Sequence, residues 1–531
     1  MFSLSKILVS DSLSKEGLAI LAEHPQLNVD IKTKMTPQEL IDCVGDYEAL
    51  IVRSGTKVTA PVIDAAKKLK VIGRAGTGID NVDLEAATKR GIIVMNTPGG
   101  NTLSTAEHTL AMILALSRQI PQANASIKAG LWEKKKFMGV ELFGKTLGIV
   151  GLGRIGAELA RRAQKFGMRV LTYDPYINME ATRRLGVEVR EFNQLLPEAD
   201  FVTLHLPLTA RTKYIIDSKA IQLMKKGARL INCARGGLVD EKALTEALQS
   251  GHLAGAALDV FEQEPAPADH PLLKFPQVVV TPHLGASTKE AQEKVAVDIA
   301  IQIKDYLISG AISNALNMPS LPAGSSRILK PYMVLAEKMS SLIAQLCSGR
   351  FEEFQLQYSG EILECPLSPL TVAALTGLLR PILGEDVNYV NAPLLAKDRN
   401  IKVMESKRSE QGDYASSICL KIKTDSEQHS ITGTIFGRQS ARVVELDGFA
   451  LEAIPEGYLL VLSNQDTPGV VGKIGKALGG LGINIGGMQL SRDEKGGRAL
   501  SLLNVDSPLP AFELEFLCRV PEILAVKQVR I

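Results

Sequence analysis

From Lys6 to about Asn96, short apolar runs alternate with segments in which apolar residues recur at helical spacing. The apolar runs predict strands at Ile7–Val9, Leu27–Ile31, Ala49–Val52, Val71–Ile72 and Ile92–Val94. The helical segments are Ser14–His24, Pro37–Val44, Ala60–Leu69 and Asp83–Arg90. Thr36 and Thr59 each precede a helical segment that opens with a proline nearby, which suits an N-cap. Alternation of this kind predicts a parallel, doubly wound α/β sheet.

A second unit of the same kind follows a predicted helix at about Ser104–Ser117. Its strands are expected at Leu147–Val150, Arg169–Tyr173, Phe201–Leu204, Ala228–Asn232, Ala256–Leu258 and Val278–Thr281. Six strands separated by helices match a complete dinucleotide-binding fold. A long helical pattern at Ser287–Ser309 follows the last strand, and we expect it to return to the first unit, which makes that domain discontinuous.

The C-terminal part begins with a segment at Ala311–Ser326 whose prolines, glycine and serines predict a linker. An amphipathic helix is expected at Arg327–Cys347 and a strand at Phe351–Glu361, followed by a mixed region to about Pro455. The last residues predict a βαββαβ order, which is ferredoxin-like. Its elements are expected at Tyr458–Ser463, Gly469–Leu481, Ile483–Leu490, Ala499–Val505, Ala511–Arg519 and Ile523–Arg530.

Composition and charge restrict the class of protein. A chain of 531 residues is too long for one core, and a formal net charge of +2 gives no general case for nucleic acid or an anionic membrane. The six cysteines lack CxxC spacing, which argues against a zinc site or a disulfide framework and favours a reducing compartment. No apolar run is long enough to span a membrane, and the N-terminus reads as a strand. We therefore expect a cytoplasmic protein without a metal site.

The first chemical motif is Gly151-x-Gly153-x-x-Gly156, which stands between a predicted strand and a helical pattern at Ala157–Phe166. Gly151 allows a tight turn, Gly153 leaves room for a pyrophosphate, and Gly156 lets helix and strand pack closely. The N–H groups at the helix start attract phosphates. Asp174 ends the next strand, where it can accept hydrogen bonds from a ribose diol and would repel a 2′-phosphate. The motif predicts NAD rather than NADP.

Hydride transfer from a hydroxyl-bearing carbon needs a base, and histidine is suited to this near neutral pH. His283 follows a strand end, where ligands of open α/β sheets bind. His205 also follows a strand end and is the strongest rival, whereas His108 lies on a helix where it packs. Glu264 or Glu262 would orient the imidazole, and the spacing does not choose between them.

Arginines at strand ends would bind an anionic substrate. Arg235 follows a predicted strand and is placed to clamp a carboxylate in bidentate fashion. Arg53 and Arg74 end strands of the first unit, and both are expected to point into the cleft between the two units. Charge-assisted hydrogen bonds of roughly 1.5–3 kcal/mol each would select a phosphorylated substrate over its bare analogue. Lys134–Lys136 are either a phosphate-binding segment or a solvated basic turn.

Four segments resemble the D-2-hydroxyacid dehydrogenase family. They are Gly151–Gly156 with Asp174, Asn232-Cys-Ala-Arg235-Gly-Gly, Asp259-Val-Phe-Glu-Gln-Glu264-Pro and Pro282-His283-Leu-Gly. The resemblance implies that Arg235 binds the substrate carboxylate, that His283 is the acid/base, and that Glu264 supports it. It also implies a set of NAD contacts: Thr77, Gly151, Gly153, Arg154, Ile155, Gly156, Asp174, Leu206, Pro207, Cys233, Ala234, Arg235, Asp259, His283, Gly285 and Ala286. The implied substrate contacts are Arg53, Ser54, Arg74, Gly76, Lys134 and Lys135.

The chain is most similar to a long form of that family, which carries an intervening domain and a C-terminal ACT domain. The similarity implies four parts: a substrate-binding domain at 1–98 and 287–312, an NAD-binding domain at 99–286, an intervening domain at 313–455 and an ACT-like domain at 456–531. It implies NAD-dependent oxidation of 3-phospho-D-glycerate to 3-phosphooxypyruvate, which opens serine synthesis, by a homotetramer. Some relatives have arginine within the lysine run of 134–136, and lysine lacks the bidentate fork.

Two alternatives stay open at this point. One is a reductase of glyoxylate, hydroxypyruvate or D-lactate from the same family, against which the extra C-terminal domains and Arg53 with Arg74 argue. The other is an NAD-sensing interaction protein on the same fold, because such a protein can keep the arginine, glutamate and histidine. The ACT-like end either binds an amino acid, near Asn464, Asp466 and Gly469, or has only a structural role.

Overall fold

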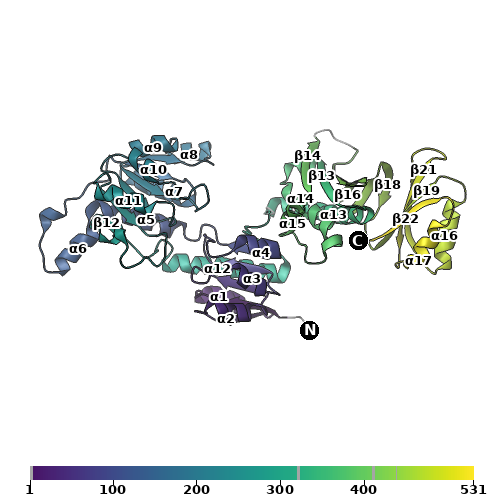
Figure 1. The fold of residues 1–531 in the computed structure, drawn as a ribbon, viewed down its shortest axis with the longest axis horizontal. Coiled ribbons are helices and arrows are strands. Elements are labelled where there is room, and N and C mark those ends of the chain that lie inside the picture. The colour runs from purple at the N-terminus through teal and green to yellow at the C-terminus, as the bar shows by residue number, and fades with distance from the viewer. Residues whose placement is uncertain (1–3, 320–322, 409–412, 438) are drawn as a thin grey trace.

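The computed structural model describes residues 4–319, 323–408, 413–437 and 439–531. In this part of the chain the strands form four separate sheets of five, seven, six and four strands. The domain of the seven-stranded sheet lies at one end of an elongated molecule, and the four-stranded sheet lies at the other (Figure 1). The predicted fold class is confirmed: two parallel α/β units are followed by a mixed and an antiparallel sheet.

The first sheet is parallel, in the order β2-β1-β3-β4-β5. Its elements are β1 (Ser5–Val9), α1 (Lys15–Ala22), β2 (Leu27–Ile31), α2 (Pro37–Val44), β3 (Ala49–Val52), α3 (Ala60–Ala65), β4 (Val71–Arg74), α4 (Leu84–Arg90) and β5 (Ile93–Asn96). Thr36 forms a capping box with Glu39. Thr59 stands at the N-cap of α3 but makes no side-chain cap bond, and α3 ends before Leu69 because Ala66 leaves helical geometry.

Helix α12 (Lys289–Ser309) packs against this first sheet although it follows the second one along the chain (Figure 1). A Cβ on Gly73 in β4 would lie 2.8 Å from a side-chain atom of Ile299, so a larger residue here would have to displace that side chain. The predicted linker also packs here, because Asn317 Oδ1 accepts a hydrogen bond from the Val94 N–H at 3.0 Å. The prediction of a linker up to residue 326 is wrong at its end, since the next helix starts at Ala323; residues 320–322 lie outside the described part.

The second sheet is parallel, in the order β12-β11-β10-β9-β6-β7-β8. Its strands are β6 (Thr146–Val150), β7 (Arg169–Tyr173), β8 (Glu188–Val189), β9 (Phe201–Leu204), β10 (Arg229–Asn232), β11 (Gly255–Leu258) and β12 (Val278–Val280). Its helices are α5 (Thr102–Arg118), α6 (Ile120–Lys128), η1 (Lys134–Lys136), α7 (Arg154–Lys165), α8 (Met179–Leu185), α9 (Phe192–Glu198), α10 (Ser218–Leu223), α11 (Glu241–Gln249) and η2 (Pro271–Lys274). The sequence missed β8, which has only two residues, and α6, whose apolar side chains face solvent.

The third sheet is mixed, in the order β14-β13-β15-β16-β17-β18, and α13 with α14 forms the helical layer of its domain (Figure 1). The elements are α13 (Ala323–Leu346), β13 (Phe351–Gly360), η3 (Glu361–Glu364), α14 (Ser368–Leu383), α15 (Ala392–Asp398), β14 (Lys402–Arg408), β15 (Ser416–Thr424), β16 (Gln428–Phe436), β17 (Ser440–Leu446) and β18 (Phe449–Ala453). The sequence left α14 undefined because almost every one of its faces is buried, which hides the helical period.

The fourth sheet has the order β20-β21-β19-β22 with antiparallel neighbours, as a ferredoxin-like βαββαβ unit requires. Its elements are β19 (Tyr458–Gln465), α16 (Val470–Gly480), β20 (Ile485–Arg492), β21 (Arg498–Val505), α17 (Ala511–Cys518) and β22 (Ile523–Arg530). All six elements were predicted, with ends that differ by a few residues.

The third domain is docked on the first one. Val390 lies only 4% exposed within the apolar cluster that also holds Val71 and Ile303 of the first domain. Next to it, Asn388 Nδ2 donates a hydrogen bond to the Gly91 carbonyl at 2.9 Å. The two domains therefore share both an apolar and a polar contact.

The close backbone approach between α13 and α14 gives a test of this fold. A Cβ on Gly377 would lie 2.0 Å from the Glu337 carbonyl oxygen, so we expect Gly377→Ala to cost about 1–3 kcal/mol of stability. Gly475→Ala is the matched control, because Gly475 also lies within a helix but has no atom within 4 Å of the place that a Cβ would take. Calorimetry of both full-length variants should show a lower unfolding temperature for Gly377→Ala alone; equal temperatures would contradict the close packing.

Candidate active site

The glycine turn between β6 and α7 has the backbone that dinucleotide binding needs. Gly151 has a φ of 101°, and a Cβ there would lie 2.5 Å from the His205 carbonyl oxygen. A Cβ on Gly156 would lie 2.3 Å from the Gly151 carbonyl oxygen, so helix and turn touch. By contrast, a Cβ on Gly153 would meet no atom within 4 Å. Space is thus left open at the N-terminus of α7, where a pyrophosphate would lie.

Asp174 lies at the end of β7, beside this turn. Its Oδ2 accepts a hydrogen bond from the Leu152 N–H at 2.9 Å, and Oδ1 accepts one from the Tyr176 N–H at 2.9 Å. These bonds fix the carboxylate next to the glycine turn and leave lone pairs for a ribose diol. The residues present therefore fit NAD.

The other predicted cofactor contacts surround the same edge of the second sheet. Arg154 begins α7 and approaches Gly99, while Ile155 packs at the edge of the apolar cluster beneath. Leu206 packs near Gly151, and the exposed Pro207 is fixed by a bond from Thr212 to its carbonyl.

Thr77, from the first domain, donates to Asn101 Oδ1 at 2.8 Å. Ala234 follows β10, and its N–H is held by Asn232.

His283 and Glu264 form the central pair of the site. Nδ1 of His283 lies 2.8 Å from Glu264 Oε2, and both side chains are partly exposed. A carboxylate accepts only, so Nδ1 carries the proton and Nε2 is left as the basic nitrogen. The hydrogen bond that His283 donates to Glu264 raises the pKa of His283 against the opposing effect of burial. Burial would raise the pKa of Glu264, but the bond to His283, the charge of His283 and the bond from the Phe261 N–H together outweigh it, and the pKa is lowered.

The alternatives to this pair have other partners. Glu262 Oε2 accepts a hydrogen bond from the Tyr214 hydroxyl at 3.0 Å. The structure therefore selects Glu264 as the partner of His283, a choice that the residue spacing left open. His205 Nε2 lies 3.1 Å from Thr203 Oγ1, and burial lowers the pKa of His205 to about 4. A histidine held neutral behind the glycine turn is a poor partner for substrate.

Asp259 and Cys233 lie beneath the loop that carries His283. The Asp259 carboxylate is fully buried and accepts bonds from the N–H groups of Leu284 at 2.7 Å and Gly285 at 2.8 Å. Burial raises the pKa of the Cys233 thiol to about 12. Gly285 is held from its other side by Ser104 and Thr105, whereas Ala286 is exposed. The Asp259 carboxylate thus supports the loop instead of facing the cleft.

Arg235 joins the two α/β domains. Its Nε donates to Asp80 Oδ2 of the first domain at 2.7 Å, and its Nη1 donates to the Ala234 carbonyl at 2.6 Å. A Cβ on Gly78 would lie 1.8 Å from Nη2, so the guanidinium lies against the first domain. The charge of Arg235 also lowers the pKa of His283.

Arg74 is a buried cation of the first domain. Burial lowers its pKa to about 10, and the charges of Arg235 and Arg53 act in the same direction. Its Nε is buried without a hydrogen-bond partner among the described residues. Gly76 makes room for it, since a Cβ there would lie 1.6 Å from Nη1.

Arg53 completes this group at the end of β3. Its Nη1 donates to the Ser12 carbonyl at 3.2 Å, and its backbone N–H is held by Asp11 at 2.6 Å. Ser54, the next residue, is exposed. We refer to Arg53, Arg74 and Arg235 as the arginine cluster.

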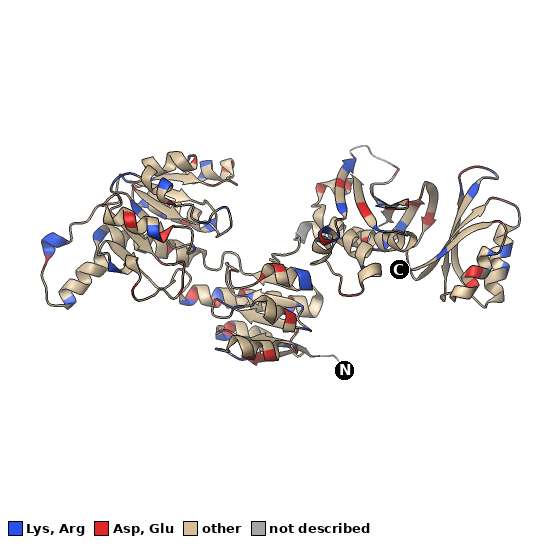
Figure 2. Ribbon diagram, viewed as in Figure 1, with Lys and Arg blue, Asp and Glu red and all other residues tan. Residues whose placement is uncertain are grey.

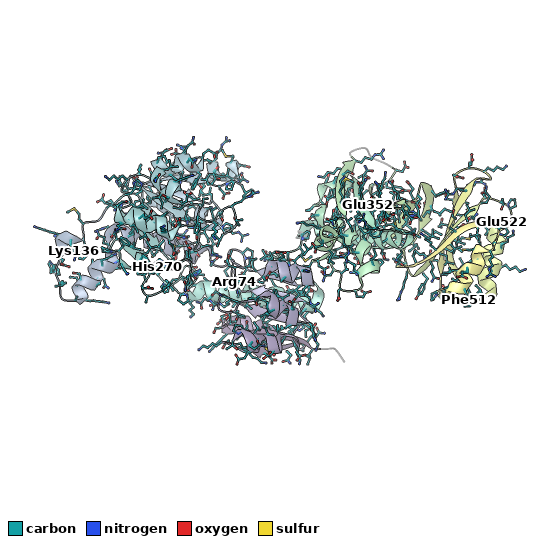
Figure 3. All side chains as sticks on the ribbon, in the orientation of Figure 1. Arg74, Lys136, His270, Glu352, Phe512 and Glu522 are labelled. Atoms are coloured by element: carbon teal, nitrogen blue, oxygen red, sulfur yellow. The ribbon has the colours of Figure 1, made fainter. Side chains whose placement is uncertain are left out.

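Lys134 and Lys135 lie elsewhere. They form η1 on an arm that extends from the second domain beyond α6, and Figure 2 shows the ribbon coloured blue at the tip of this arm. Figure 3 shows Lys136, their neighbour, far from Arg74. Within one chain, therefore, these lysines do not meet the arginine cluster.

Sequence reasoning missed two groups that the structure brings to the site. Asp80 was not singled out from the sequence, yet it is the acid bound to Arg235. His108 was expected to pack, yet its Nε2 lies 3.1 Å from Asp259 Oδ1. Neither contact has a local signal, because the partners are about 150 residues apart along the chain. Among the described residues, no group of three or more His, Cys, Asp or Glu is arranged to hold a metal ion.

Comparisons with known proteins show which families this chain is similar to. Residues 110–285 match the model for the NAD binding domain of D-isomer specific 2-hydroxyacid dehydrogenases, and residues 328–447 match the D-3-phosphoglycerate dehydrogenase intervening domain. D-3-phosphoglycerate dehydrogenase of Methanocaldococcus jannaschii is 47% identical over 98% of both chains.

Solved structures match about 60% of this chain. A Thermus thermophilus protein is 39% identical with a TM-score of 0.55, covering 59% of this chain and 99% of that one. D-Lactate dehydrogenase of Aquifex aeolicus, solved with NAD and lactic acid, is 29% identical with a TM-score of 0.53, covering 60% and 100%. The cofactor is NAD, and the chain is an oxidoreductase. It belongs to the D-3-phosphoglycerate dehydrogenase family.

Proposed function

We propose that the chain catalyses the NAD-dependent oxidation of 3-phospho-D-glycerate to 3-phosphooxypyruvate, the step that opens serine synthesis. The observation that carries this proposal is the arginine cluster beside the His283–Glu264 pair. The charges of Arg53 and Arg235 both act on the guanidinium of Arg74, and the Asp80 carboxylate pairs with the guanidinium of Arg235. A substrate that bears both a carboxylate and a phosphate would neutralise the remaining positive charge.

The proposed reaction uses few side chains. Arg235 binds the carboxylate of the substrate and orients C2. Nε2 of His283 accepts the hydroxyl proton, and Glu264 stabilises the imidazolium that forms. Bound NAD supplies the acceptor for the hydride that leaves C2. Arg53 and Arg74 would bind the phosphate, and closure of the two domains would exclude water during the transfer.

The arm supports a role for a second copy of the chain. Trp132 and Met138, which flank its lysines, are 84% and 82% exposed, and Ile120 and Ile127 of α6 are each 53% exposed. Such an apolar arm is typical of a subunit contact. We infer that it packs on another subunit of a homotetramer and that Lys134 and Lys135 reach the partner's arginine cluster.

The C-terminal domain is proposed to be an ACT domain, on the basis of its strand order and its contacts. Asp466, in its first turn, accepts a hydrogen bond from the Gly496 N–H at 3.1 Å and pairs with Arg492 at 2.8 Å. We also propose the cytoplasm as the location, since all six cysteines are free thiols. Among the described residues, no helix is both long and apolar enough to cross a membrane.

The proposed substrate is tested by NADH consumption with 3-phosphooxypyruvate and with unphosphorylated hydroxypyruvate. We expect kcat/KM to favour the phosphorylated compound by about 10-fold or more, roughly the effect of one charge-assisted hydrogen bond. Arg74→Gln should remove most of this preference and leave the rate on hydroxypyruvate nearly unchanged. Arg90→Gln is the matched control, because Arg90 is an exposed arginine on α4.

Comparable rates on the two compounds would contradict the proposal and favour a reductase of bare 2-oxo acids. Absence of turnover on either compound, with NADH still bound, would favour a protein that senses NAD.

The pH dependence tests the proton acceptor. The folded-state pKa of His283 is raised, chiefly by its bond to Glu264, and oxidation needs the neutral imidazole. Oxidation should therefore increase as pH rises through this pKa, while reduction, which needs the imidazolium, should decrease. Glu264→Gln should move the acidic limb of the kcat/KM profile for oxidation to lower pH and lower kcat roughly tenfold. A limb at the same pH in both enzymes would rule out this pairing.

A further inference from the structure

His108 lies in the middle of α5, the helix that leads into the second domain. Its side chain is 18% exposed. Nε2 of the imidazole lies 3.1 Å from Asp259 Oδ1 and 3.2 Å from Thr281 Oγ1. The hydroxyl of Thr281 in turn donates to Asp259 Oδ1 at 2.6 Å. Because the carboxylate only accepts, Nε2 of His108 carries a proton and donates it toward Asp259.

Asp259 is a buried charge that needs these donors. Its side chain has no exposed surface, and burying an unpaired carboxylate is unfavourable by several kcal/mol. Burial tends to raise the pKa of Asp259, but the bonds from His108, Thr281 and the backbone outweigh it and the pKa is lowered. Among the described residues, His108 is the one potential cation in an ion pair with Asp259.

The other bonds of Asp259 hold the loop that carries His283. The N–H groups of Leu284 and Gly285 donate to its carboxylate, and the His283 N–H donates to its backbone carbonyl at 2.8 Å. His283 itself has a φ of 57°, in the left-handed region that a side chain disfavours. Persistence of this conformation requires anchors on the residues around it, and Asp259 supplies three.

Charge links the same residues. Asp259 and Glu264 both raise the pKa of His283, whereas Arg235 lowers it. The groups facing Asp259 are His108 from α5, Cys233 from β10 and Glu264 from the following loop. Of these, only His108 donates to the carboxylate and offsets its charge. Removing that donor would expose His283 to a less compensated negative charge.

We propose that His108 is a positioning residue for hydride transfer: it holds the buried Asp259 carboxylate, and through it fixes the geometry and the protonation of His283. The inference rests on the proposed function for its kinetic readout. His108 does not touch substrate in this arrangement, so its effect should be on kcat and on the pH profile more than on KM.

The test compares His108→Leu, which removes the donor, with His108→Gln, which keeps an N–H. Glu107→Gln is the control, since Glu107 is adjacent on α5 and its side chain is 66% exposed. We expect His108→Leu to lower kcat roughly tenfold, as for a displaced catalytic group, with NADH affinity unchanged. Its acidic limb for oxidation should move to higher pH, and His108→Gln should lie between it and the wild type.

A second readout needs no turnover. Diethyl pyrocarbonate acylates neutral imidazole, so the rate of modification of His283, followed by peptide mass spectrometry across pH, reports its protonation directly. In His108→Leu the midpoint of this rate should also move to higher pH. If the wild type lacks the proposed activity, this readout still tests His108.

Either of two results would overturn the inference. One is a His283 midpoint that is the same in His108→Leu and in the wild type. The other is a fall in kcat that His108→Gln and His108→Leu share equally, with no change in the pH profile, because that pattern indicates loss of packing alone.

Discussion

The hydrogen bond between Glu264 and Nδ1 of His283 is the interaction on which the proposed chemistry depends. It fixes the tautomer, and in the proposed reaction it would direct Nε2 to the substrate and stabilise the imidazolium after proton transfer. The bond exists because β11 and β12 are parallel neighbours whose carboxyl ends lie at one edge of the sheet. The buried Asp259, which follows β11, accepts hydrogen bonds from the His283 loop. These bonds hold His283 in a left-handed backbone conformation that a side chain disfavours.

The positive charge of the arginine cluster favours a substrate that carries negative charge. Burial lowers the pKa of Arg74 to about 10, and the positive charges of Arg235 and Arg53 act in the same direction. Asp80 offsets part of this charge through its bond to Arg235. A carboxylate and a phosphate would relieve the remaining repulsion and join the two domains, because the arginines come from both. In the proposed function, recognition of the substrate and closure of the cleft would therefore be the same electrostatic event.

The sequence was sufficient for features that are local. The glycine turn, Asp174 and most strands were predicted because each depends on neighbouring residues. Spacing did not choose between Glu262 and Glu264, since that choice is made by Tyr214, which lies about 50 residues away. It also missed the Asp80–Arg235 and His108–Asp259 contacts for the same reason. The sequence also did not show that Lys134 and Lys135 lie on an arm. Helix α6, which leads into the arm, exposes its apolar side chains and has no buried apolar face, so the hydrophobic pattern did not reveal it.

A crystal structure of the chain with NAD and 3-phospho-D-glycerate is the most direct measurement. The account predicts the substrate carboxylate on Arg235, the C2 hydroxyl within hydrogen-bond distance of His283 Nε2, and the phosphate on Arg74 and Arg53. Lys134 or Lys135 of a second subunit should lie near that phosphate. A phosphate bound away from Arg74, or a C2 hydroxyl that faces away from His283, would contradict the account.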